Sequence, residues 1–180
     1  MKNFEMQATV DAILGLYESF GESTGEPHNI LEHSIQVAQL AEEEGYDDEV
    51  ILAAFFHDIG YLLPNHSSNS RRSYGQIGSD YLRANGFSEK VVQVVIMQTE
   101  AQRYLAWKFP ERKFESPFSS PTYPEVMSEK EAKAYEKNPY FFLSLKVNEW
   151  DVSTLNMQAV CVNLDHYRTI ALRHLQGNLS

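Results

Sequence analysis

The chain has 180 residues, of which 43% are hydrophobic and 22% are charged, and these values fit one globular domain with its own core. No apolar run approaches the roughly 18 residues of a membrane span, and a formal net charge of −10 disfavours nonspecific binding to nucleic acid or to an anionic membrane. The single Cys161 excludes an internal disulfide framework, and the first residues carry no signal-peptide pattern. We therefore expect one domain over residues 1–180, located in a reducing cytoplasm and acting on a small molecule.

The first part of the chain has the hydrophobic spacing of helices. Apolar residues recur every three or four positions in a first helix that ends near Gly21, namely Val10, Ile13, Leu14, Tyr17 and Phe20. A loop follows, and then a second helix from Ile30 to Glu44. One face of this helix, which includes His33, is expected to point into the core. Asp47 can cap the third helix, which is apolar and leads into His57 and Asp58.

The rest of the chain also reads as helices joined by polar loops. Two irregular segments, Leu62–Arg72 and Pro110–Pro124, are candidates for a lid, an active-site cover or an oligomer contact. The expected helices are Tyr74–Ala84, a long one from a cap at Ser88 toward Phe109, a short one opened by the capping box Ser128–Glu131, Tyr140–Asp151 and Leu164–Gln176. No convincing strand or internal repeat is present, so the sequence predicts a single all-α domain.

His57 and Asp58 are adjacent at the end of an uncharged run, Ile51–Phe56, which points both side chains into the core. An unpaired buried carboxylate would cost several kcal/mol, roughly, and a divalent cation would remove that cost. The alternative is structural, with Asp58 capping a neighbouring helix and His57 forming a satisfied core histidine.

Two further inward polar residues can complete a metal site. His33 lies 24 residues before His57, a separation that allows two antiparallel helices to lie side by side, and Asp151 follows an apolar helical stripe. Taken singly, His33 could be a hydrogen-bonded core histidine and Asp151 a helix-end residue. Together with His57 and Asp58 they form a ligand set for a divalent ion such as iron, manganese or cobalt, with water in the remaining positions.

With these residues in place, the chain resembles the HD-domain superfamily, whose signature is a distant His, an adjacent His-Asp pair and a late Asp on a helical bundle. Within it, the chain is most similar to the small diiron oxygenases that cleave hydroxylated aminoalkylphosphonates. The matching blocks are Leu31–Ser34, Ala53–Gly60, Gly78–Arg83, Gly86–Glu89, Arg103–Leu105, Trp150–Asp151 and His166–Arg168. The resemblance implies His33, His57, Asp58 and Asp151 as ligands of the first metal.

The second iron of those oxygenases shares the bridging Asp and takes two further histidines, whose positions hold Tyr74 and Gln98 here. Imidazole donors dominate iron affinity at such a site, so we expect one metal ion per chain, and the resemblance implies that it is iron, with manganese and cobalt as alternatives. A rebuilt second site would need Tyr74, Glu100, His28 or His66 as a substitute ligand.

The substrate-binding positions also differ from those of the oxygenases. The family's phosphonate-contacting Lys and Arg fall near Gln102 and Asn148, and its lid tyrosine falls near Ser23. Glu26, which matches the residue that grips the substrate's ammonium group, is kept. The resemblance therefore implies a substrate that bears an amine and need not be a phosphonate.

Three functions remain open. The first is an HD-domain oxygenase with Asp58, Glu26 and Tyr74 as the residues nearest the chemistry. The second is a mononuclear HD phosphohydrolase acting on a small phosphate ester or nucleotide, in which one metal activates a water. Arg71, Arg72 and Arg103 could then serve the phosphate. The third is a degenerate member that binds a ligand and catalyses nothing.

Overall fold

The computed structural model describes residues 3–20, 29–63, 73–111, 125–154 and 163–178, and every regular element within them is a helix. The all-α prediction is therefore confirmed. None of these helices combines the length and apolarity needed to cross a bilayer. The elements are α1 (Asn3–Phe20), α2 (Ile30–Glu43), α3 (Asp48–Phe55), the 3-10 helix η1 (Ile59–Leu62), α4 (Tyr74–Ala84), α5 (Glu89–Ile96), α6 (Gln98–Lys108), α7 (Glu129–Tyr135), α8 (Phe141–Ser153) and α9 (Leu164–Gly177).

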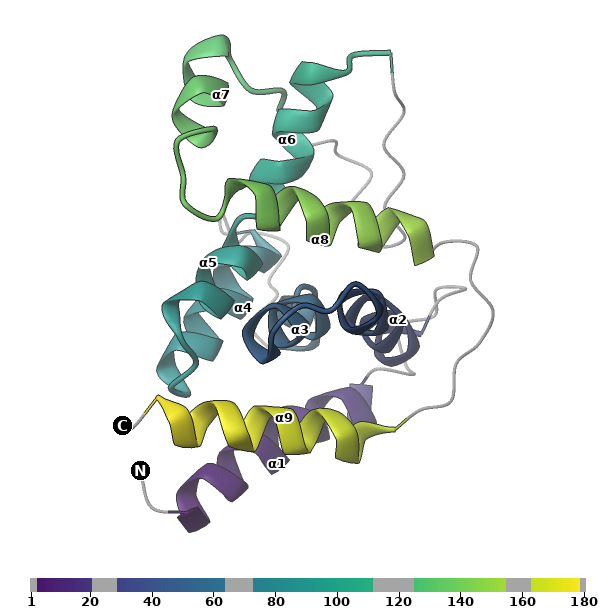
Figure 1. Ribbon diagram of the computed structural model, residues 1–180, viewed down its shortest axis with the longest axis vertical. Coiled ribbons are helices and arrows are strands. Elements are labelled where there is room, and N and C mark those ends of the chain that lie inside the picture. The colour runs from purple at the N-terminus through teal and green to yellow at the C-terminus, as the bar shows by residue number, and fades with distance from the viewer. Residues whose placement is uncertain (1–2, 21–28, 64–72, 112–124, 155–162, 179–180) are drawn as a thin grey trace.

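Helix α3 is the centre of the bundle. It lies beside α2 in the middle of the molecule, with α8 crossing above the pair, α1 and α9 below, and α4 and α5 to one side (Figure 1). Its uncharged run is buried on all sides, and Phe55 and Phe56 are 0% and 1% exposed. Burying each such ring stabilises the fold by about 1.5–3 kcal/mol, so the turn that follows α3 is held firmly.

Local signals set how α2 and α3 meet. The Asn29 side chain accepts hydrogen bonds from Leu31 N and Glu32 N at the start of α2, and Asp47 caps α3 by accepting from Val50 N. Gly45, with φ +78°, ends α2 in the left-handed conformation that glycine adopts without strain. The short connection makes the two helices antiparallel neighbours, which brings the beginning of α2 beside the end of α3.

The expected long helix from Ser88 toward Phe109 is wrong, because the chain breaks at Met97 into α5 and α6. The two halves pack in different places. The valines of α5 join the main core around α3, whereas Met97 and Tyr104 belong to a second cluster with Tyr135 and Phe141. A change of helix direction keeps the same hydrophobic period, so the spacing did not reveal it.

Close backbone contact joins η1 to α4. A Cβ atom added at Gly60 would lie 2.1 Å from the carbonyl oxygen of Tyr74, and one at Gly78 would lie 3.0 Å from Gly60 N. Only glycines permit this approach. Leu62, expected to open a surface loop, instead ends η1 and is 5% exposed, while residues 64–72 lie outside the described ranges. Tyr74 is thus fixed against the turn that contains Asp58.

Candidate metal centre

His57 and Asp58, expected at the inner end of the third helix, lie in the turn directly after α3. His57 is 3% exposed, and its Nδ1 lies 2.8 Å from the carbonyl oxygen of Ala54 in the last turn of α3. A carbonyl can only accept, so Nδ1 carries the proton and donates it. In the neutral ring the Nε2 atom therefore keeps its lone pair, and it faces the interior.

His33 reaches the same point from α2. Its Nε2 lies 3.2 Å from Nε2 of His57, and its Nδ1 lies 3.0 Å from the hydroxyl of Thr154. His33 is 3% exposed, as the inward stripe of α2 predicted. A ring whose outer nitrogen is held by a hydrogen bond and whose inner nitrogen meets other donors has the arrangement of a metal-ligating histidine.

Asp58 and Asp151 bring two carboxylates to the imidazoles. Asp58 Oδ2 lies 3.2 Å from His57 Nε2 and 3.8 Å from His33 Nε2, and candidate ligand atoms of these three residues all lie within 4.8 Å of one another. Asp151 Oδ1 lies 3.1 Å from His33 Nε2 and 3.9 Å from His57 Nε2. The structure therefore brings all four sequence-predicted residues together.

The donor set fits a divalent cation. Asp151 Oδ1 is buried and has no hydrogen-bond partner within the described part of the chain, which is costly for a charged oxygen. Two imidazole nitrogens and two carboxylates suit a divalent ion of the iron, manganese or cobalt type. A cation among them would satisfy Asp151 and remove the repulsion between the two Nε2 lone pairs.

The electrostatics of the metal-free site point the same way. Burial alone would lower the pKa of His57, but the charge of Asp58 and the hydrogen bond to it, with smaller contributions from Asp151 and Ala54, raise that pKa to about 9. Burial alone would raise the pKa of Asp58, yet His57 and then His33 lower it overall. Positive charge is thus stabilised at this point of the fold.

Helix α8 is held over the site by a contact at the far end of α2. The Trp150 indole donates to Glu44 Oε1 at 2.8 Å, and Lys146 pairs with the same oxygen at 2.9 Å. Tyr46 packs edge-on against Trp150 with ring centroids 5.2 Å apart. Since Asp151 is the next residue, these contacts fix where its carboxylate meets α2.

Asp58 marks the side of the site that is nearest to solvent, since its side chain is 15% exposed against 5% for Asp151. Tyr61 and Tyr74 stack nearby with ring centroids 3.7 Å apart. Burial, followed by the charge of Asp58, raises the pKa of Tyr61, whereas Tyr74 is 38% exposed. Tyr74 is therefore a surface aromatic beside the site, and Tyr61 remains a protonated phenol.

Two polar residues considered for the second metal or for phosphate are engaged elsewhere. Arg103 donates to Glu100 and Glu131, each at 2.9 Å, and to the carbonyl of Glu125 at 2.7 Å. Its guanidinium therefore joins α6 to the segment leading into α7, and Glu100 is its partner. These contacts do not support Arg103 as a phosphate ligand or Glu100 as a replacement metal ligand.

The other predicted positions divide between buried residues and segments outside the description. Gln98 is 8% exposed and donates through Nε2 to Val94 O at 2.9 Å, and Asn148 is 3% exposed. Both side chains are neutral. The resemblance implies a metal-ligating histidine at the position of Gln98 and a cation near Asn148, and neither group is present there. Glu26, Ser23, His28, His66, Arg71 and Arg72 lie outside the described residues.

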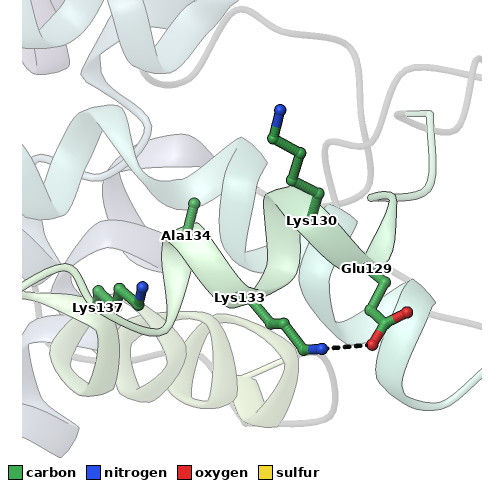
Figure 2. Close-up of a pocket in the computed structure, with 5 residues that line it drawn as sticks. All are labelled: Glu129, Lys130, Lys133, Ala134 and Lys137. Atoms are coloured by element: carbon green, nitrogen blue, oxygen red, sulfur yellow. Dashed lines mark hydrogen bonds and ion pairs between the residues drawn. The ribbon is translucent and has the colours of Figure 1, made fainter.

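A separate hollow over α7 is lined by Glu129, Lys130, Lys133, Ala134 and Lys137 (Figure 2). Lys133 Nζ lies 2.6 Å from Glu129 Oε1, and these side chains are 66% and 68% exposed. Such pairs one turn apart on a solvated helix contribute little to stability. The hollow is thus a charged helix surface, distinct from the His and Asp cluster.

Sequence reasoning missed Thr154 and Tyr61. Thr154 lies three residues after Asp151, a spacing that places two residues on one helix face, and this signal could have found it. Tyr61 lies three residues after Asp58 but in a 3-10 helix that the pattern did not reveal. The places of Thr154 and Tyr61 beside the site depend on packing between elements.

Comparison with known proteins gives a consistent picture. Residues 30–136 match the model of the HD domain, a span that contains His33, His57 and Asp58 and stops before Asp151. An uncharacterised protein of Acanthamoeba polyphaga mimivirus is 35% identical over 178 residues, covering 92% of this chain and 81% of the relative.

Two curated relatives have named activities. The 1-hydroxy-2-(trimethylamino)ethylphosphonate dioxygenase (glycine-betaine-forming) of Leisingera caerulea is 31% identical over 109 residues, covering 57% of this chain and 55% of that protein. The hydroxymethylphosphonate dioxygenase of Gimesia maris is 28% identical over 153 residues, covering 79% of this chain and 76% of the relative. Both names describe dioxygenases of hydroxylated phosphonates.

Proposed function

The chain belongs to the HD-domain family, and on that premise we propose that it is a metal-dependent oxygenase that cleaves a small, hydroxylated, amine-bearing substrate. The observation that carries the proposal is the convergence of His33, His57, Asp58 and Asp151, with both Nε2 atoms turned toward the carboxylates. The similarity to two phosphonate dioxygenases supports the oxygenase class.

The proposed metal ligands are His33, His57, Asp58 and Asp151. An iron ion bound among them would supply the electron-transfer chemistry that dioxygen requires. The protein contributes orientation, because the Ala54 carbonyl and the Thr154 hydroxyl hold the outer nitrogens of the two rings. It also excludes water from three of the ligands, since His33, His57 and Asp151 are each 3% exposed.

Substrate is proposed to approach on the side of Asp58, the ligand nearest to solvent. Tyr74 lies on this side and is assigned a substrate-facing role, and Glu26, which precedes α2 in the sequence, is assigned to an ammonium group through a charge-assisted hydrogen bond. Gln102 and Asn148 stand where the resemblance implies cations. The preferred substrate therefore carries an amine and at most a weakly charged acid group.

A mononuclear phosphohydrolase is the second candidate. It is favoured by Tyr74 and Gln98, which stand where the diiron oxygenases have histidines, because a single metal suffices for activating a water against a phosphate ester. Against it, Arg103 already donates to three acceptors, on Glu100, Glu125 and Glu131.

The test is a ligand screen on metal-loaded protein by thermal stabilisation, with dioxygen consumption as a second readout. Amino alcohols, aminophosphonates and nucleoside monophosphates should each be supplied at about a hundredfold excess over the dissociation constant, where binding adds roughly 2.7 kcal/mol of stability. Wild type is compared with Glu26→Gln and with Glu43→Gln, a control on the exposed face of α2.

We expect amine-bearing compounds to stabilise wild type and Glu43→Gln but not Glu26→Gln, and one of them to stimulate dioxygen uptake. Stabilisation by nucleotides alone, unaffected by Glu26→Gln, would favour the phosphohydrolase. A protein that binds ligands but turns over neither class would be a degenerate member.

A further inference from the structure

The hydroxyl of Thr154 links two of the proposed metal ligands. Thr154 is the C-cap residue of α8 and is 3% exposed. Its Oγ1 donates to the backbone carbonyl of Asp151 at 2.8 Å and lies 3.0 Å from Nδ1 of His33. One side chain thus contacts the ring of one proposed ligand and the backbone of another.

The direction of these hydrogen bonds follows from counting protons. A threonine hydroxyl has one hydrogen, and the Asp151 carbonyl can only accept, so that hydrogen is used in the bond to Asp151. The bond to His33 must then be donated by the imidazole through Nδ1–H. His33 is consequently held in the tautomer whose Nε2 lone pair faces His57 and the carboxylates.

The two histidines differ in what holds them. His57 donates to the backbone carbonyl of Ala54, an acceptor that no substitution of a side chain removes. The outer nitrogen of His33 instead meets a side chain, the hydroxyl of Thr154. This hydrogen bond of His33 can therefore be removed by a substitution.

We propose that Thr154 is a positioning residue that fixes the tautomer and ring orientation of His33 for metal binding. The proposal rests on the metal site described above. Outer partners of metal-ligating histidines typically contribute a factor of about 10–100 to metal affinity. Without this acceptor, the tautomer of His33 with its proton on Nδ1 would lose the hydrogen bond that favours it, and the link between the His33 ring and the Asp151 backbone would be broken.

The experiment measures the dissociation constant of cobalt(II), by competition with a chelator, for wild type, Thr154→Val and Thr154→Ser. Valine preserves the branched shape and removes the hydroxyl, whereas serine retains the hydroxyl. Thr169→Val is the matched control, because Thr169 also donates to a helix carbonyl, that of Asp165 at 2.9 Å, but is exposed. The visible spectrum of bound cobalt reports a change in ligand geometry.

We expect Thr154→Val to bind cobalt about 10- to 100-fold more weakly with an altered spectrum, and Thr154→Ser and Thr169→Val to remain near wild type. Wild-type affinity in Thr154→Val, or failure of serine to restore affinity, would overturn the proposal. Absence of cobalt binding by wild type would instead contradict the metal site itself.

A second measurement needs no variant. In zinc-loaded wild type, the imidazole ¹⁵N spectrum of His33 should show the proton on Nδ1 and the metal on Nε2. A His33 ring that binds through Nδ1 and carries its proton on Nε2 would contradict the role of Thr154 even if Thr154→Val failed to fold.

Discussion

His33 and His57 face each other with their Nε2 atoms 3.2 Å apart, although 24 residues separate them in the sequence. With both outer nitrogens donating, the facing nitrogens are two lone pairs, which repel unless a proton or a cation lies between them. The flanking carboxylates of Asp58 and Asp151 make a cation the favoured occupant.

Replacing Asp58 with Ala should reduce the metal bound after purification at least about tenfold, because a charged ligand is lost from the set. Metal content per chain by elemental analysis measures the effect. Asp80→Ala is the matched control, since the Asp80 side chain is 52% exposed and pairs with Arg83 on the surface of α4. Full metal content in Asp58→Ala would show that the site is assigned wrongly.

The protein should bind about one metal ion per chain, because imidazole donors dominate iron affinity and Tyr74 and Gln98 offer none. Anaerobic titration with iron(II), followed by elemental analysis after gel filtration, gives the stoichiometry. Two tightly bound irons would mean that other side chains rebuild the second position, and replacing Tyr74 with Phe would then identify or exclude its phenol.

Gly60→Ala should destabilise the fold by about 1–3 kcal/mol, because the new methyl group would lie 2.1 Å from the Tyr74 carbonyl oxygen and push α4 away from η1. Gly15→Ala is the control, since its added Cβ has nothing within 4 Å and alanine favours a helix by up to about 1 kcal/mol. Urea unfolding of both variants tests the pair. Equal stability of the two variants would argue against the tight contact.

Stability should fall in mild acid through His174. Burial lowers its pKa, with partial opposition from Glu49 and neighbouring acids, and its Nε2 accepts a hydrogen bond from Ser88 N at 3.1 Å. In the unfolded chain this histidine has its ordinary pKa near 6.5. As the pH falls, the unfolded chain therefore binds a proton before the folded protein does. This contribution is fully present above that value and is lost as pH falls through the lowered folded pKa.

The measurement is the urea midpoint between about pH 7.5 and pH 5.5 for wild type and His174→Gln. The loss of stability should be smaller in His174→Gln than in wild type. An unchanged slope in His174→Gln would remove His174 as the cause.

The sequence predicted those features that one helix determines by itself. The inward stripe of α2 identified His33 as a buried polar residue, and the uncharged run did the same for His57 and Asp58. The Ser128 capping box predicted the start of α7 where the structure has it. Helical period and cap chemistry are local properties, and they survive folding unchanged.

Contacts between elements were not predictable in this way. The break at Met97 serves two separate hydrophobic clusters, and nothing in the spacing around it reports which cluster each half joins. Arg103 was considered for phosphate because of its positive charge. Two of the acceptors that engage it, on Glu125 and Glu131, follow more than twenty residues later, so the local sequence did not reveal them. Thr154 was missed for the same reason, since its partner His33 lies on another helix.

The place of α8 in the chain also bears on synthesis. His33, His57 and Asp58 leave the ribosome well before Asp151 and Thr154, which lie at the end of α8. A nascent chain that ends before α8 would therefore hold an incomplete set of the proposed ligands and a His33 ring without the Thr154 hydrogen bond. At the proposed site, high-affinity capture of an ion would follow the synthesis of α8, and metal retention would report that α8 has been made and packed.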